Sequence, residues 1–244
     1  MQLKKLAQIA LLAVAATTAP KLMANTVELY AYSYEFGGGG EITAVSTPSF
    51  LANYAPSAIV NGGFETFCVE VAVDASINTP YSFTLSSQTT EGNQLSLGAA
   101  YLYYLFGKGA LPGYNYADAP SSPDGSRLQD AEWLQTALWM LMNQPNYFGQ
   151  DPNSDPYLQL AISNFGSYAA ANAANNGAFP VDVMQLWDLN NAGSPGPLGY
   201  QDQLVLVPDG GSTALMLGVG FSLLSLVPIV KRRRMAAAAA RSKQ

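Results

Sequence analysis

The sequence of 244 residues contains no histidine and a single cysteine, and these two deficits exclude several kinds of chemistry. Without histidine the chain cannot build a Ser-His-Asp or Cys-His catalytic site, nor a His-ligated zinc or non-haem iron site. A single cysteine also cannot form a disulfide within the chain. Any bound metal would therefore have to be a hard cation held by oxygen ligands.

One acidic segment is similar to the start of a calcium-binding loop, namely DPNSD at residues 151–155. However, Pro156 stands where the turn glycine of such a loop belongs, and Ile162 stands where the closing glutamate belongs. We therefore interpret this segment as an Asp/Asn/Pro turn, and we predict neither a metal site nor a cofactor.

Positive charge is nearly absent from the central part of the chain. Between residues 25 and 207 the only cations are Lys108 and Arg127, against sixteen carboxylates, which makes the net charge of this part −14. Nucleic-acid binding requires basic stripes that neutralise phosphates, and the sequence has none there. The composition excludes nucleic acid as a partner, and an acidic surface is expected to keep an exported domain soluble.

The first 24 residues have the pattern of a secretory signal peptide. Two lysines supply the positive region, residues 6–16 supply the apolar region, and a small-residue cleavage site ends at Ala24. The apolar run is too short to span a bilayer, which disfavours an uncleaved anchor. We predict cleavage after Ala24 and an extracytoplasmic domain at residues 25–206.

The C-terminal part has the pattern of a transmembrane segment. Residues 212–230 form a run of 19 without charge, close to the roughly 20 that a helix needs to cross the hydrocarbon core. A basic stop follows at once and places that end in the cytoplasm, so residues 235–244 are predicted to be a cytoplasmic tail. The basic stop consists of Lys231, Arg232, Arg233 and Arg234.

A short motif precedes this predicted helix, made of Val207, Pro208, Asp209, Gly210 and Gly211. The motif, the helix and the basic stop together resemble the PEP-CTERM class of C-terminal sorting signals, and within it the VPDSG-like variants. The resemblance implies recognition by an exosortase, a membrane-embedded cysteine transpeptidase that cuts near the motif. We therefore expect residues 207–234 to be a sorting signal. It would lead the protein through the inner membrane to the cell surface or the extracellular matrix.

The predicted fold class of the extracytoplasmic domain is α+β. The clearest strand is predicted at residues 64–73, where alternate residues from Phe67 to Val73 share one face. Further strands are predicted at residues 27–34, 41–45, 81–87, 181–189 and 200–207, and helices at 96–106, 127–143 (with Ser126 as N-cap) and 157–174. These elements predict an antiparallel β barrel or sandwich with inserted helices.

Two residues of the domain are unusual for their positions. Cys68 is a lone cysteine on a predicted strand of an exported protein, where a thiol invites oxidation, and it shares a strand face with Glu70. Gln135 lies in the apolar stripe of a predicted helix, and a buried amide without hydrogen-bond partners is costly. Both oddities are explained if Cys68 and Gln135 face each other.

The residues around these two positions are FCVE at 67–70 and LQTALW at 134–139. They resemble the thioester domains of bacterial surface adhesins. Those domains carry an aromatic-Cys-apolar-acidic motif on a strand and an apolar-Gln-x-x-apolar motif on a later helix. The resemblance implies an internal thioester between Cys68 and Gln135, formed when the cysteine sulfur displaces ammonia from the glutamine carboxamide.

A thioester of this kind would transfer the acyl carbon to an amine-bearing surface protein or exopolysaccharide without histidine. Aromatic side chains, namely Phe67, Trp133 and Trp139, would slow its hydrolysis. Glu70 would either orient or deprotonate groups at the site or be a solvated strand carboxylate.

Two other interpretations of the cysteine stay open. One is an inert buried thiol in a non-catalytic structural or glycan-associated surface protein, whose tyrosines and tryptophans offer contact surface. The other is an intermolecular disulfide. We do not expect an enzyme, because the paired carboxylates of a hydrolase cannot be recognised in the sequence.

Overall fold

The structure is a computed structural model that describes residues 25–31, 35–36, 39–47, 63–117, 127–189 and 200–207. The predicted signal peptide, the sorting motif after Val207, the helix at 212–230 and the basic stop lie outside the described residues. In the part of the chain that is described, no helix is long and apolar enough to cross a membrane.

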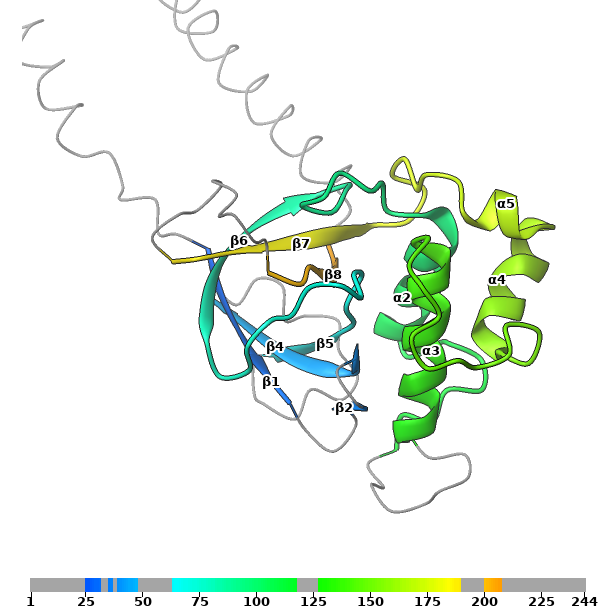
Figure 1. The fold of residues 1–244 in the computed structure, drawn as a ribbon, viewed down its shortest axis with the longest axis horizontal. Coiled ribbons are helices and arrows are strands. Elements are labelled where there is room, and N and C mark those ends of the chain that lie inside the picture. The colour runs from blue at the N-terminus through cyan, green and yellow to red at the C-terminus, as the bar shows by residue number, and fades with distance from the viewer. Residues whose placement is uncertain are drawn as a thin grey trace, which may run out of the picture.

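A curled antiparallel sheet of six strands forms one half of the molecule (Figure 1). Its strand order is β5-β4-β1-β6-β7-β8, and each neighbouring pair is antiparallel. The strands are β1 (Thr26–Tyr30), β4 (Ile42–Thr47), β5 (Gly63–Thr66), β6 (Pro80–Ser86), β7 (Val181–Trp187) and β8 (Gln203–Leu206). A separate short pair is formed by β2 (Glu35–Phe36) and β3 (Gly39–Gly40). The α+β prediction is confirmed, with the sheet curled into a half-barrel.

The two outermost strands of the sheet are joined by the segment that follows β5. Leu204 N donates to Phe67 O at 3.0 Å, and Val69 N donates to Asp202 O at 3.1 Å. Thr66 Oγ1 also donates to Leu204 O at 2.6 Å. The first and last strands of the sheet order therefore meet at Cys68.

Four helices gather on one side of the sheet (Figure 1): α2 (Leu97–Gly107), α3 (Arg127–Leu141), α4 (Pro156–Phe165) and α5 (Tyr168–Ala171). Ser96 caps α2, its side chain accepting from Ala99 N at 3.1 Å. Asp155 caps α4 in the same way, accepting from Tyr157 N and Leu158 N at 2.9 and 3.0 Å. The acidic segment 151–155 is thus the turn that the sequence predicts.

Two predicted elements are wrong in extent. The helix predicted at 157–174 is broken at Gly166, whose φ of 82° is in the left-handed region that ends a helix and favours glycine. The strand predicted at 64–73 ends at Thr66, because the chain then leaves β4, forms a single bridge from Cys68 to Gln203 and bends at Val69. Ser126, the predicted N-cap of α3, lies outside the described residues.

Two apolar clusters form the core, one among the helices and one inside the curled sheet. Helix α3 belongs to both clusters: Leu134 and Leu138 pack with the other helices, whereas Trp139 packs inside the sheet. The helix is buried on nearly every side rather than along one stripe. It is therefore the element that carries side chains from the helical layer into the sheet.

Candidate functional site

Cys68 lies directly opposite Gln203, in an antiparallel bridge that joins the segment after β5 to β8. The flanking hydrogen bonds, from Leu204 N to Phe67 O and from Val69 N to Asp202 O, define a non-hydrogen-bonded pair. In such a pair the side chains lie close together, and the N–H and C=O of each residue point away from the partner strand. The backbone groups of Cys68 are thus turned outward from β8.

The side chain of Gln135, on α3, meets those outward groups. Its Nε2 donates to Cys68 O at 2.7 Å, and its Oε1 accepts from Cys68 N at 3.1 Å. Oε1 accepts a second bond from Gly40 N at 3.0 Å. Oε1 faces two N–H donors and Nε2 faces a carbonyl acceptor, and these contacts assign the orientation of the Gln135 carboxamide. Gln135 is fully buried, and its amide is held against Cys68 from both ends.

The Cys68 thiol is also fully buried, inside the cluster of the curled sheet. Gln203 Nε2 donates to Cys68 Sγ at 3.5 Å and to Gln201 O at 3.1 Å, which fixes the direction of the Gln203 carboxamide. Zero exposure of the thiol disfavours an intermolecular disulfide. The chain therefore brings together the two residues that the sequence singled out, and it adds a second amide beside the sulfur.

The predicted aromatic shield is divided between the two clusters. Trp139 is in the same cluster as Cys68 and packs against Phe148, with ring centroids 5.5 Å apart. Phe67 faces the helices, where its ring meets Phe106 edge-on at 5.0 Å. Trp133 is partly buried and packs against the helical cluster. Of the three predicted aromatic residues, Trp139 is the one packed in the cluster of the thiol.

Glu70 is not a solvated carboxylate, because its side chain is only 1% exposed. Its Oε2 accepts from Asp202 N at 3.2 Å, and its backbone oxygen accepts from Gln201 Nε2 at 2.8 Å. Burial, and next the negative charge of Asp202, raise the pKa of Glu70 to about 7. These contacts connect Glu70 to the residues before Gln203 rather than to Cys68 or Gln135, so it holds that segment opposite Cys68.

Asp202 is the second buried carboxylate beside the site. Its oxygens accept from Thr90 N at 2.6 Å, from Thr90 Oγ1 at 3.1 Å and from Leu186 N at 3.2 Å. The pKa of Asp202 is nevertheless raised to about 6, and burial is the largest cause of this rise. The sequence pattern missed both Asp202 and Gln203. The available signal was the cluster of polar residues, Gln-Asp-Gln, at the start of an otherwise apolar last strand.

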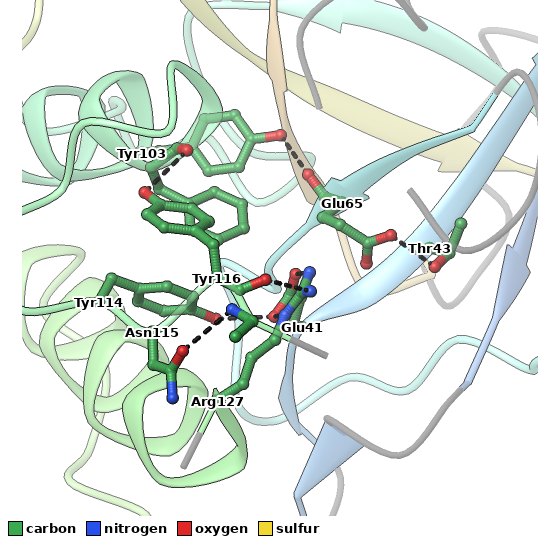
Figure 2. A network of polar contacts seen from close by, with 10 residues as sticks. Glu41, Thr43, Glu65, Tyr103, Tyr114, Asn115, Tyr116 and Arg127 are labelled. Carbon is green, nitrogen blue, oxygen red and sulfur yellow. Dashed lines mark hydrogen bonds and ion pairs between the residues drawn. The ribbon is translucent and has the colours of Figure 1, made fainter. Parts of the chain in front are cut away.

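A buried ion pair joins Arg127 to Glu41, the residue that follows Gly40 in the chain (Figure 2). The Arg127 guanidinium, at the start of α3, binds both carboxylate oxygens of Glu41, with Nε 2.8 Å from Oε2. Tyr114 Oη donates to the same Oε2 at 2.7 Å, and Arg127 Nη1 donates to Tyr116 O at 3.1 Å. Glu41 directly follows Gly40. Gly40 N–H donates to Gln135 Oε1, and Arg127 lies on α3 together with Gln135. The ion pair therefore ties the chain next to Gly40 to the helix that carries Gln135.

The structure thus brings a thiol-bearing residue, a carboxamide and two backbone N–H donors together without histidine. The thiol of Cys68 is a nucleophile, the carboxamide carbon of Gln135 is an electrophile, and two backbone N–H groups point at the oxygen of that carboxamide. No group of three or more Cys, Asp or Glu side chains within the described ranges is placed to hold a metal ion.

Comparison of the chain with protein-family models, with curated proteins and with solved structures found no match.

Proposed function

We propose that this chain is an exported envelope or matrix protein that attaches covalently to amine-bearing partners through an internal thioester between Cys68 and Gln135. The observation that carries the proposal is the pairing of the Gln135 carboxamide with both backbone groups of Cys68, in a fully buried site. The predicted motifs at 67–70 and 134–139 meet there. We further propose that the curled sheet, whose outer strands are joined by the bridge between Cys68 and Gln203, corresponds to the β barrel of a thioester-type domain.

Formation of the bond is a nucleophilic acyl substitution. Cys68 Sγ attacks the side-chain carbonyl carbon of Gln135, the S–C bond forms, and the C–N bond of the carboxamide breaks. Ammonia leaves with the thiol proton, so a thiol and an amide give a thioester and ammonia. Negative charge develops on Oε1 in the transition state, where the N–H groups of Gly40 and Cys68 stabilise it.

The second step consumes the thioester and attaches the partner. The nitrogen of a primary amine attacks the same carbonyl carbon, the C–S bond breaks, and the sulfur leaves as a thiolate that takes up a proton from the amine. The products are an amide between the partner and residue 135 and the regenerated Cys68 thiol. Exclusion of water from the buried site protects the activated acyl group until the amine enters.

The mass of the exported protein tests this proposal. We expect the purified protein to be lighter than its sequence mass by one ammonia, and Cys68→Ala or Gln135→Ala to restore the full mass. Methylamine should open the bond in the unmodified protein, leaving an adduct on residue 135 and a thiol that reacts with thiol reagents. The measurement is intact-mass spectrometry with peptide mapping.

Gln144→Ala is the matched control, because Gln144 also presents a carboxamide to the backbone, accepting from Val71 N at 3.3 Å. It should leave the mass deficit and the methylamine adduct unchanged. A full sequence mass for the unmodified protein, together with no adduct after methylamine treatment, would refute the thioester.

A structural protein without covalent chemistry is the second candidate. It is favoured by the three hydrogen bonds of the Gln135 carboxamide, which satisfy the buried amide without any covalent bond. In that case Gln135 has a structural role, because its carboxamide satisfies the backbone N–H and C=O of Cys68. The partner would then be a glycan or a surface protein that binds non-covalently. The mass measurement separates the two candidates.

We propose that an exosortase removes the C-terminal segment during export. The support is the sorting motif itself; its first residue, Val207, is held to the fold by a hydrogen bond from its N–H to Pro180 O at 3.0 Å. We expect C-terminal peptide mapping of the surface protein to recover peptides up to the motif and none beyond Lys231. Recovery of those distal peptides from the mature protein would refute removal of the segment, and the predicted helix would then be an ordinary membrane anchor.

A further inference from the structure

Gln203 places a polar side chain in the core at a position that an apolar side chain of similar size could fill. It is fully buried on β8, opposite Cys68, and its Nε2 lies 3.5 Å from the Cys68 sulfur. Its Oε1 is also buried and accepts no hydrogen bond from the described residues. A buried acceptor without a donor is costly in a folded protein, so such a group points to a ligand or a chemical role.

The nitrogen end of the carboxamide lies at the reacting sulfur, and its oxygen end accepts no hydrogen bond from the described residues. Nε2 also donates to Gln201 O at 3.1 Å, so the nitrogen end is fixed on the sulfur side and Oε1 is left as the acceptor. Nε2 therefore donates to the atom that becomes a thiolate when a thioester is opened. Oε1, on the same planar group, can accept an N–H from an amine that approaches the acyl carbon.

We propose that Gln203 is a further catalytic residue of this site, which stabilises the Cys68 thiolate and binds the incoming primary amine. This inference rests on the proposed thioester. A hydrogen bond to sulfur lowers the pKa of a leaving thiol and so speeds the breaking of the C–S bond. The acceptor on Oε1 selects a nucleophile that carries N–H protons, which favours primary amines over tertiary ones as substrates.

The test is the rate at which methylamine opens the thioester in the full exported protein, followed by intact mass. Gln203→Met keeps the length and the volume of the side chain but removes both polar ends. We expect it to slow aminolysis by roughly 10-fold to 100-fold, less than the loss of an oxyanion-hole donor because sulfur is a weaker acceptor. Gln185→Met is the matched control, because the Gln185 carboxamide lies on the neighbouring strand β7 and bonds Thr84 Oγ1 and Gln88 O, and this variant should react at the wild-type rate.

A second variant and a spectroscopic readout separate a chemical role from a packing role. Gln203→Glu retains the shape of the side chain, and at alkaline pH its carboxylate cannot donate to sulfur, so it should also slow aminolysis. In a Gln135→Ala background, where the thiol stays unacylated, Gln203→Met should raise the pKa of Cys68, followed through the ultraviolet absorbance of the thiolate.

The outcomes distinguish this inference from the proposed function. If the unmodified protein shows no mass deficit, the thioester itself is refuted. If the deficit is present but folded Gln203→Met or Gln203→Glu reacts with methylamine as fast as Gln185→Met, Gln203 has no role in the reaction. An unchanged pKa of the thiol in the Gln135→Ala background would contradict the thiolate contact in the same way.

Discussion

Replacing Arg127 by methionine is expected to destabilise the domain by about 3–5 kcal/mol, because it leaves the Glu41 carboxylate buried without its cation. Both side chains are at most 1% exposed, and they share two contacts between the guanidinium and the carboxylate. Burial by itself lowers the pKa of Arg127, but the hydrogen bonds and charge of Glu41 outweigh it and raise the pKa. Arg127 therefore stays charged beside Glu41, and its loss is costly.

Urea or thermal unfolding of the variants measures this effect. Removing both charges, as Glu41→Leu with Arg127→Met, should cost less than removing the arginine alone, because no uncompensated charge remains. Lys108→Met is the control: Lys108 is exposed and lies 5.7 Å from the centre of the Tyr104 ring, so its loss should cost less than about 1 kcal/mol. Equal effects of Arg127→Met and Lys108→Met would contradict the structural role of the ion pair.

The same substitution has a functional consequence that can be measured independently. Glu41 follows Gly40, whose N–H is one of the two donors to Gln135 Oε1. Loss of the ion pair should therefore slow thioester formation as well as weaken the fold, and a folded fraction of Arg127→Met should carry a smaller mass deficit than the unmodified protein.

The second large effect is a dependence of stability on pH that comes from Glu70 and Asp202. Their folded-state pKa values, about 7 and about 6, lie above the values of the unfolded chain, 4.5 and 3.8. Between these values the folded protein retains protons that the unfolded chain has lost. Their contribution to stability is therefore fully present below about pH 4 and is lost as pH rises through 7, so the unfolding temperature should increase from pH 8 to pH 5.

Glu70→Gln should flatten this dependence and stabilise the domain above pH 7 by on the order of 1–2 kcal/mol. The amide oxygen can take over the hydrogen bond from Asp202 N, and the NH₂ group replaces the oxygen that accepts no hydrogen bond from the described residues. Thermal unfolding across the pH range measures the slope.

Asp202→Asn provides the contrast for this experiment. It also removes a buried charge, but Asp202 accepts three hydrogen bonds, from Thr90 N, Thr90 Oγ1 and Leu186 N, and an amide cannot accept all of them. This variant should lose stability at every pH. If Glu70→Gln is also destabilised at pH 8, the raised pKa of Glu70 is not what limits stability there.

Several features of the domain were predictable because they depend on local pattern. Alternation of apolar residues predicted the strands at β1, β6 and β7, and caps and breakers predicted α2. The conflict at two positions, a lone cysteine and an amide in an apolar stripe, predicted that Cys68 and Gln135 would meet. In the structure the Gln135 carboxamide meets the backbone N–H and C=O of Cys68, because a buried amide requires hydrogen-bond partners.

Charge was predicted less well, because a sequence does not say which charges are buried. The count of carboxylates predicted an acidic surface, yet five of them, Glu41, Glu65, Glu70, Asp155 and Asp202, have buried side chains. Arg127, one of two cations in the domain, is buried as well. Burial of a charge depends on a partner from a distant part of the chain, which composition cannot supply.

The α+β class, the order of most elements and the two residues of the candidate thioester were predictable from the amino-acid pattern, since they follow from local periodicity and from the rarity of cysteine. The connection of the segment after β5 to β8, and with it the contacts of Gln203, Asp202 and Gly40 at the site, became known from the folded chain alone. Those contacts connect residues up to 135 positions apart. They depend on how the sheet curls, and the period of a single strand carries no information about that.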